Sequence, residues 1–200
     1  MADFHANVRG LSDAAWRLRA RAPAPSTLPF ALTLFTDDRR TPNVMAMLSA
    51  LPDAGRIPPI AVLFRHDRHP HRMALAEEAR AVVQARGHYF VIARAFLPRA
   101  DGIHQGRDRR LGLRSAAVHS LAEVQAANAL GVDLGFVSPV FATRSHPGAT
   151  PLGPLAAATL AQLANFPCLA LGGMDARTAR QLEGLPFQGI GAIGAFTDQG

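Results

Sequence analysis

The chain has 200 residues, of which 48% are hydrophobic, so it can bury the core of one domain of modest size. Its formal charge of +6 comes from arginines spread along the whole chain without an aromatic ladder, which argues against a nucleic-acid-binding protein. The sequence shows no apolar run of membrane-spanning length, no signal-peptide pattern and no lysine that could form a Schiff base. We therefore expect a cytoplasmic protein without nucleic-acid or membrane partners, and we exclude class I aldolase chemistry.

Residues 1–28 are predicted to stand apart from the domain formed by residues 29–200. Residues 11–21 have the pattern of a basic amphipathic helix with Trp16 on its apolar side, and the proline-rich residues 22–26 form a stiff linker. We expect this helix either to cover the bottom of a barrel or to pack on a neighbouring subunit in a homo-oligomer.

Short apolar segments of strand length alternate with helical stretches along the rest of the chain. The predicted strands span residues 31–35, 60–64, 89–92, 102–104, 115–118, 134–137, 168–171 and 189–193. The predicted helices span residues 44–51, 71–86, 121–130, 154–164 and 176–182. This alternation predicts an α/β fold, a short (β/α)₈ TIM barrel with a parallel sheet. The barrel should be abbreviated between its third and fifth strands, because residues 93–113 hold one strand and no convincing helix.

Glycines follow the last two predicted strands. In a (β/α)₈ barrel, backbone N–H groups at these two places can converge on one phosphate. The predicted phosphate-binding residues are Gly172, Gly173, Ile193, Gly194 and Ala195. The alternative is that the glycines in these segments only permit a tight turn or relieve crowding inside the barrel. We expect a small-molecule substrate that carries a phosphate.

The segment from Ser138 to Gly148 is rich in hydroxyl groups and follows the sixth predicted strand, where it should face the mouth of the barrel. Contact with a ligand explains this composition better than loop capping does. A second histidine-rich segment, formed by His66, His69 and His71, has a spacing that resembles a metal site. Pro70 interrupts it and carboxylates are few nearby, so we predict a solvated loop there and no metal.

From residue 32 to residue 195, the order of motifs resembles that of the thiamine phosphate synthase/TenI family. Members of that family are small (β/α)₈ barrels that act on the thiazole phosphate half of thiamine. The matching motifs are Thr36-Asp37, Phe64-Arg65, the segment from Ala100 to His104, Val118-His119-Ser120, the Ser138–Gly148 loop, the segment from Leu171 to Met174, and the segment from Ile193 to Ala195.

The chain departs from the pattern of the synthases where they bind magnesium and pyrophosphate. The resemblance implies an Asn-Asp pair after the third strand and an Asp after the fourth, but residues 92–94 read Ile-Ala-Arg and residues 106–109 read Gly-Arg-Asp-Arg. Asp108 alone would make a poor magnesium site, and whether Arg94, Arg107 or Arg109 lines the site stays open. The lysines expected after Arg65 and in the sixth loop are absent as well. We therefore expect no cofactor, and magnesium only if the protein is a synthase.

TenI-like members perform a cofactor-free tautomerisation of a thiazole carboxylate phosphate with a histidine in a Val-His-Ser context, which implies His119 as the general acid/base. Imidazole suits this role because it exchanges protons near neutral pH. The alternative is that His119 only hydrogen-bonds the backbone near a helix start. His104 and His146 could share the proton work or bind the carboxylate. The predicted substrate-binding residues are Arg65, His104, Ser138, Thr143, Ser145 and His146.

The expected function is therefore a thiazole tautomerase, which is an isomerase. One alternative is thiamine phosphate synthase, a transferase that joins pyrimidine pyrophosphate to thiazole phosphate. The other is a non-catalytic protein that binds a thiamine-related phosphate.

Overall fold

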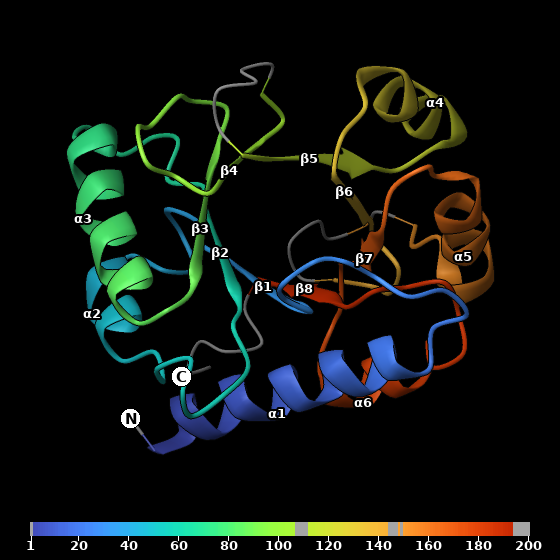
Figure 1. Ribbon diagram of the computed structural model, residues 1–200, viewed down its shortest axis with the longest axis horizontal. Coiled ribbons are helices and arrows are strands. Elements are labelled where there is room, and N and C mark those ends of the chain that lie inside the picture. Colours follow the sequence, from blue (N-terminus) through green and yellow to red (C-terminus); the bar gives the residue numbers. More distant parts are fainter. Residues whose placement is uncertain (1, 107–111, 144–147, 149, 194–200) are drawn as a thin grey trace.

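Eight parallel strands form a closed barrel in which each strand pairs with its neighbour in sequence and β8 pairs with β1 (Figure 1). The structure is a computed structural model that describes residues 2–106, 112–143, 148 and 150–193. The strands are Leu32–Phe35 (β1), Ala61–Phe64 (β2), Tyr89–Ala93 (β3), Gly102–His104 (β4), Leu113–Val118 (β5), Leu134–Val137 (β6), Cys168–Ala170 (β7) and Ile190–Ala192 (β8). The helices are Ala2–Ala20 (α1), Val44–Ser49 (α2), Arg72–Ala85 (α3), Leu121–Leu130 (α4), Gly153–Leu163 (α5) and Ala176–Arg180 (α6). The predicted (β/α)₈ barrel is confirmed.

The barrel is abbreviated where the sequence predicts it. Residues 94–101 connect β3 to β4 without a helix, and part of the next connection lies outside the described residues. The first connection is held by Asp101, whose carboxylate accepts hydrogen bonds from the Phe90 N–H at 2.7 Å and from Gln84 Nε2 at 2.9 Å. Leu97 and Ala100 are buried beside it. A packed loop thus takes the place of a covering helix.

β5 begins two residues before the predicted strand because a buried arginine is part of it. Leu113 and Arg114 pair with β4, and the Arg114 guanidinium donates to the carbonyls of Leu130, at 2.7 Å, and Gly131. The Asp133 carboxylate accepts from the Arg114 N–H at 2.8 Å. The sequence pattern missed the start of β5 because Arg114 is charged. Its guanidinium can be buried there because the carbonyls of the neighbouring turn accept its hydrogen bonds.

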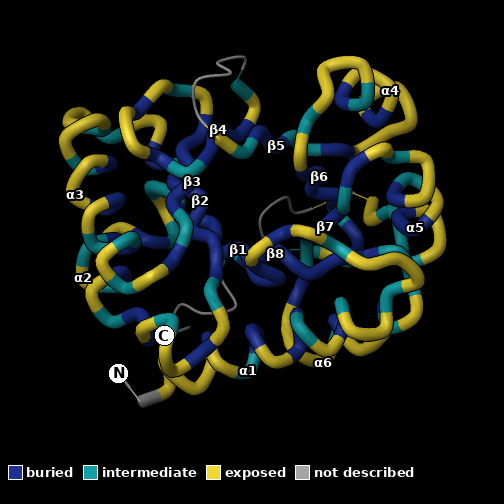
Figure 2. The backbone as a smooth tube through the Cα atoms, viewed as in Figure 1, coloured by how far each residue is buried: buried dark blue, intermediate teal, exposed yellow. Residues whose placement is uncertain are grey.

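The hydrophobic core has two layers, one between the strands and the helices and one inside the barrel, and buried residues follow the strands (Figure 2). Inside the barrel, the rings of Phe35 and Phe136 meet edge to face with their centroids 4.9 Å apart. A Cβ atom at Gly191 would lie 2.9 Å from the Phe35 ring and 3.0 Å from Leu171. This glycine therefore relieves crowding in the interior, as the packing alternative predicts.

Helix α1 is longer than predicted, since it begins at Ala2 instead of at residue 11. Its apolar stripe includes Val8, Leu11, Ala15 and Leu18, which are buried at helical spacing. The prediction missed its first turns because they contribute few large apolar residues. α1 packs along the side of the barrel, against α6 and β1 (Figure 1). In the described residues, no helix combines the length and apolarity needed to cross a membrane.

Arg19, near the end of α1, anchors this helix to the bottom of the barrel. Its Nε donates to the carbonyl of Gln188 and its Nη1 to that of Leu28, both at 2.8 Å, and its Nη2 donates to that of Phe30. These carbonyls precede β8 and β1, so one guanidinium joins the two strands at which the barrel closes. Burial lowers the pKa of Arg19 to about 10, which leaves it charged at neutral pH.

Replacing Arg19 with methionine keeps most of the apolar stem but removes every hydrogen bond to these carbonyls. We expect the free energy of unfolding to fall by about 2–3 kcal/mol, because hydrogen bonds from a charged donor to partly buried groups are lost. Urea denaturation measures the change. Arg17→Met, on the exposed side of the same helix, is the control and should change stability by less than about 0.5 kcal/mol. Equal effects of the two substitutions would contradict the anchoring role.

Candidate active site

The carboxyl ends of all eight strands meet at one end of the closed barrel, which we call the mouth. Most of the predicted site residues that are described lie at or just after these strand ends. They are Arg65, His104, His119, Ser138, Gly172, Gly173 and Ile193. Thr143 is described and partly buried in the loop that follows Ser138. Ser145, His146, Gly194 and Ala195 lie outside the described residues.

His104 is buried inside the barrel just below the mouth, with 4% of its surface exposed. Its ring packs edge to face against Phe35 and Phe136, and its Nδ1 lies 3.0 Å from the Ser115 hydroxyl. Burial lowers the pKa of His104 to about 3, and the positive charges of Arg65 and Arg94 act in the same direction. The imidazole is therefore neutral near pH 7, so it can hydrogen-bond a ligand but offers no positive charge.

The state of His104 predicts how stability depends on pH. Below about pH 6.5 the unfolded chain protonates this histidine, while the folded protein keeps it neutral down to about pH 3. Stability should therefore fall with decreasing pH, and His104 should account for about 2 kcal/mol of that fall between pH 7 and pH 5. Urea titrations of the wild type and of His104→Gln at both pH values measure the difference. Identical losses in the two proteins would show that His104 is not held neutral.

Asp37 and Arg65 organise the mouth beside β1 and β2. The Asp37 carboxylate accepts from the N–H groups of Arg39, at 2.9 Å, and Arg40, at 2.8 Å. It also lies 3.6 Å from Arg65 Nη2 and 3.7 Å from Arg40 Nη1. One carboxylate thus serves two guanidinium groups. Arg65 is thus held at the mouth in a position from which it can contact an anion.

The histidine-rich segment after β2 differs from the prediction, because His66 is buried instead of solvated. Its Nδ1 lies 3.1 Å from the Thr36 hydroxyl, its Nε2 lies 3.1 Å from the Thr41 carbonyl, and its ring stacks on Phe64. The carbonyl can only accept, so Nε2 carries the proton, and burial lowers the pKa of His66. His66 thus joins the loops after β1 and β2. Among the described residues, no three His, Cys, Asp or Glu side chains cluster as metal ligands.

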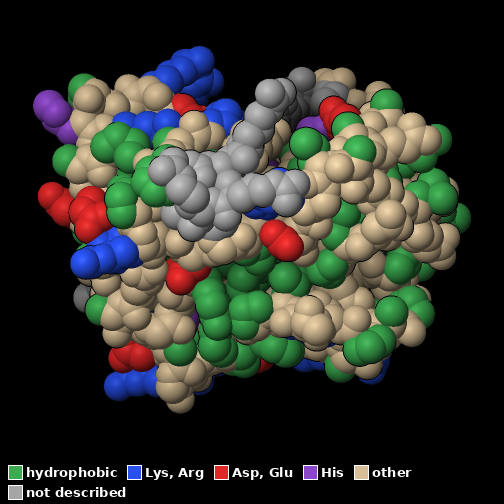
Figure 3. Space-filling model, turned by 45° about the horizontal axis from the view of Figure 1, so that its top comes forward, with side chains coloured by type: hydrophobic (Ala, Val, Ile, Leu, Met, Phe, Trp, Pro, Cys, Tyr) green, Lys and Arg blue, Asp and Glu red, His purple; other side chains and the backbone are tan. Residues whose placement is uncertain are grey.

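Arg94 lies at the end of β3, where the sequence departs from the synthase pattern. Its backbone has a φ of 52°, in the left-handed region. Its guanidinium bonds the Asp67 carboxylate and donates from Nη1 to Gln105 Oε1 at 2.8 Å. Asp67 also pairs with Arg72 Nη2 at 2.9 Å, so again one carboxylate serves two arginines. Figure 3 shows that basic and acidic side chains lie next to one another on one face of the molecule.

His119 follows β5 and is half exposed, and its Nδ1 lies 2.9 Å from Glu123 Oε2. The same carboxylate oxygen accepts from the His119 backbone N–H. Ser120 caps α4, because its hydroxyl accepts from the Glu123 N–H at 3.3 Å. The side chain of His119 therefore bonds a carboxylate, whereas the alternative predicted a backbone partner. Sequence reasoning missed this pair, for which the four-residue spacing was the only signal.

The glycines after β7 meet the loop that begins at Ser138. Gly172 and Gly173 have φ values of +91° and +65°, and Cβ atoms there would lie 2.7 Å from Pro139 Cα and 2.6 Å from the Ala142 carbonyl. Backbone conformation and close packing thus require both glycines. Yet their N–H groups make no hydrogen bond to any described residue. The two donors are free to bind an anion, and the phosphate site stays a prediction.

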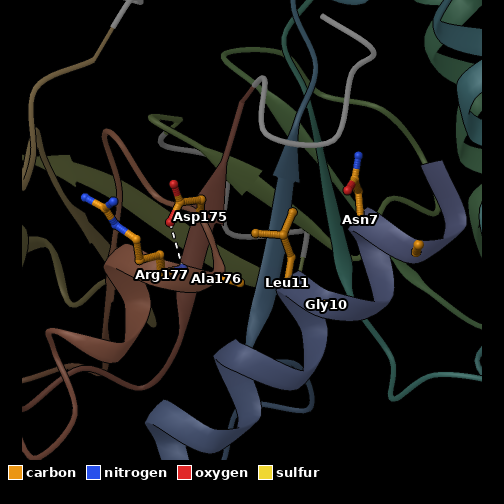
Figure 4. Close-up of a pocket in the computed structure, with 7 residues that line it drawn as sticks. Asn7, Gly10, Leu11, Asp175, Ala176 and Arg177 are labelled. Carbon is orange, nitrogen blue, oxygen red and sulfur yellow. Dashed lines mark hydrogen bonds between the residues drawn. The ribbon is translucent and has the colours of Figure 1, made fainter. Parts of the chain in front are cut away.

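A separate cavity of about 290 Å³ lies between α1 and the start of α6 (Figure 4). It is lined by Ala6, Asn7, Gly10, Leu11, Asp175, Ala176 and Arg177. The Asp175 carboxylate is occupied as the cap of α6, because it accepts from the N–H groups of Arg177, at 2.8 Å, and Thr178, at 2.7 Å. The cavity adjoins the loop after β7, since Asp175 follows Gly173 by two residues, but none of the predicted site residues lines it.

Comparisons with known proteins agree with this fold. The sequence model of a family described as thiamine monophosphate synthase matches residues 34–196. Curated proteins yield no significant match. The structure of thiamine phosphate pyrophosphorylase from Pyrococcus furiosus is similar, with a TM-score of 0.67 and 22% identity over 81% of this chain and 84% of that chain. A native KDPGal structure has a TM-score of 0.51 and 16% identity over 84% of each chain. At these identities the structural likenesses show the fold alone.

Proposed function

Because the chain belongs to the thiamine monophosphate synthase family, whose model matches residues 34–196, its function is related to thiamine biosynthesis. We propose that it binds a thiazole phosphate at the mouth and acts as a thiazole tautomerase. In this proposal His119 is the general acid/base, and the reaction needs no metal. The observation that carries the choice of reaction is the pairing of Arg94 with Asp67 at the end of β3.

A synthase would need a magnesium site for the pyrophosphate of its second substrate, and Mg²⁺ binds through carboxylate oxygens. Two of the described carboxylates at the mouth are already paired with arginines, and a third, Asp38, accepts from the Arg68 N–H at 3.2 Å. Asp37 faces two arginines, and Asp67 is shared between Arg72 and Arg94. The Arg94 guanidinium repels a metal cation, whereas it attracts the carboxylate of a bound substrate. This arrangement supports an anionic substrate that binds directly to arginine, as a thiazole carboxylate phosphate would.

The phosphate of that substrate is proposed to bind the free N–H groups of Gly172 and Gly173. Both N–H groups lie in a turn that is held from two sides. Phe141 N–H, in the loop after β6, donates to the Gly172 carbonyl at 3.1 Å, and Thr178 Oγ1, in α6, donates to that of Gly173 at 2.9 Å. Donors that are already fixed lose little entropy when an anion binds. Substituting either glycine would strain the turn itself, so glycine variants are a poor test of this site.

The proton transfer is assigned to His119 because it is exposed and supported by a carboxylate. His104 is less suited, since burial holds its pKa at about 3 and keeps it neutral. In the proposed reaction, the imidazole of His119 takes a proton from one atom of the thiazole tautomer and returns a proton to another. The product is the aromatic isomer, and no oxidant is consumed. His104 contributes a neutral hydrogen-bonding group at the base of the mouth.

Replacing His119 with asparagine should lower turnover of the thiazole tautomer by roughly 10²–10⁴-fold, the range that general acid/base catalysis typically contributes. Affinity for the thiazole phosphate product, measured by calorimetry, should change little, because the phosphate is bound elsewhere. His69→Asn, in the loop after β2, is the matched control and should keep full turnover. If turnover survives in His119→Asn but disappears in His104→Asn or His146→Asn, the reaction stands and the catalyst is a different histidine.

Magnesium should have no effect on binding of the thiazole phosphate, and condensation with the pyrimidine pyrophosphate should be undetectable. The measurements are calorimetry with and without the metal, and detection of thiamine phosphate after incubation with both substrates. Magnesium-dependent formation of thiamine phosphate would restore the synthase alternative. Tight binding of thiazole phosphate without turnover by the wild type would instead identify a non-catalytic binding protein.

A further inference from the structure

Glu123 is the carboxylate that bonds His119, and how it supports the proton transfer proposed above follows from the geometry of the pair. We infer that Glu123 is a positioning residue, which sets the tautomer and the orientation of His119 so that Nε2 is the nitrogen that exchanges the substrate proton. This inference deepens the proposed function and rests on it for its catalytic consequence. The structural part, the state of the imidazole, can be tested without substrate.

The geometry assigns the proton on Nδ1. Glu123 Oε2 lies 2.9 Å from Nδ1 of His119 and also accepts the backbone N–H of the same residue. An ionised carboxylate can only accept, so Nδ1 must be the donor of this hydrogen bond. In the neutral imidazole the lone pair is then on Nε2. Two bonds from one oxygen to one residue hold the ring against both rotation and a change of tautomer.

The position of His119 along β5 favours the mouth as the place where Nε2 acts. Side chains alternate between the two faces of a strand, and Ser115 faces the barrel interior, where its hydroxyl contacts His104. Val118 faces the other way, into the core beneath the helices. His119 is four residues after Ser115 and one residue past the end of β5, so it continues the face of the strand that points into the barrel.

Capping of α4 explains only part of the position of the Glu123 carboxylate. Ser120 already caps this helix through its hydroxyl, which accepts from the Glu123 N–H. A glutamate in the first turn gains some stability from the helix dipole wherever its carboxylate points. The bond that Oε2 accepts from the His119 backbone N–H is of the capping-box kind, whereas the contact of Oε2 with Nδ1 is additional to these effects. Glu123 and His119 are both about half exposed, at 48% and 50%, so the pair needs no burial to form.

The arrangement accounts for both directions of the proposed proton transfer. The lone pair on Nε2 takes a proton from the substrate, and the ring becomes a cation that the Glu123 carboxylate stabilises. Nε2–H then returns a proton to a different atom of the substrate, and the ring is neutral again. The carboxylate stays ionised throughout, and its charge lowers the cost of the cationic intermediate.

The test is ¹⁵N NMR of His119 in the free protein, at a pH where its ring is neutral. Wild type should show the Nδ1–H tautomer. In Glu123→Ala the signals should move to the Nε2–H tautomer, whereas Glu123→Gln should retain Nδ1–H, because its amide oxygen can still accept. The matched control is Ser120→Ala, which removes the cap of the same helix and should leave the tautomer unchanged. An Nε2–H tautomer in wild type, or no change in Glu123→Ala, would overturn the inference.

Turnover adds a second readout that separates positioning from stability. Glu123→Ala should lower kcat at least about tenfold with little change in KM, and Glu123→Gln should fall between it and wild type. Ser120→Ala should stay within about twofold of wild type, although it weakens the helix start. An equal loss in Ser120→Ala would show that only the fold of this turn matters. Absence of tautomerase activity in wild type would refute the proposed function. The NMR result would then still decide whether Glu123 sets the tautomer of His119.

Discussion

Closure of the barrel between β8 and β1 is the constraint on which the rest of the structure depends. At this junction the backbones approach so closely that a Cβ atom at Gly189 would lie 1.9 Å from the Ala31 carbonyl, and Gly189 has a φ of +148°. The Ile190 N–H donates to that same carbonyl at 2.9 Å. Closure in turn brings together at one mouth residues that are separated by most of the chain, such as those after β1 and β8. Arg19 supports the same junction from below.

Electrostatics at the mouth follow from a chain that has arginines but no lysines. Guanidinium groups stay charged at any working pH, so the pairs around Asp37 and Asp67 are permanent features of the site. Each of these two carboxylates is shared between two arginines. Carboxylates that are already paired with arginines offer little to a divalent cation, which supports the anionic substrate that we propose. The absence of lysine thus bears on the substrate as well as on the reaction mechanism.

Two histidines at the ends of neighbouring strands show that burial determines which chemical role the same side chain can take. His104 lies among Phe35, Phe136 and Ser115, and its pKa of about 3 keeps it neutral. His119 lies in the open beside a carboxylate. The same side chain is therefore a neutral hydrogen-bonding group in one place and a proton carrier, as we propose, in the other. Neither environment is visible in a strand pattern, because each is created by residues from other strands or from the next helix.

The sequence by itself determined the fold class and the order of its elements, because strand and helix patterns depend on neighbouring residues. It also determined the family, whose motifs lie at the strand ends. It did not predict that α1 begins at Ala2, since the packing of that helix on α6 and β1 compensates for a weak apolar pattern. Only the tertiary structure decided that His66 is buried between two loops and that Arg94 pairs with Asp67. These features depend on groups brought together by the pairing of β1 with β2 and of β2 with β3, and no local spacing encodes them.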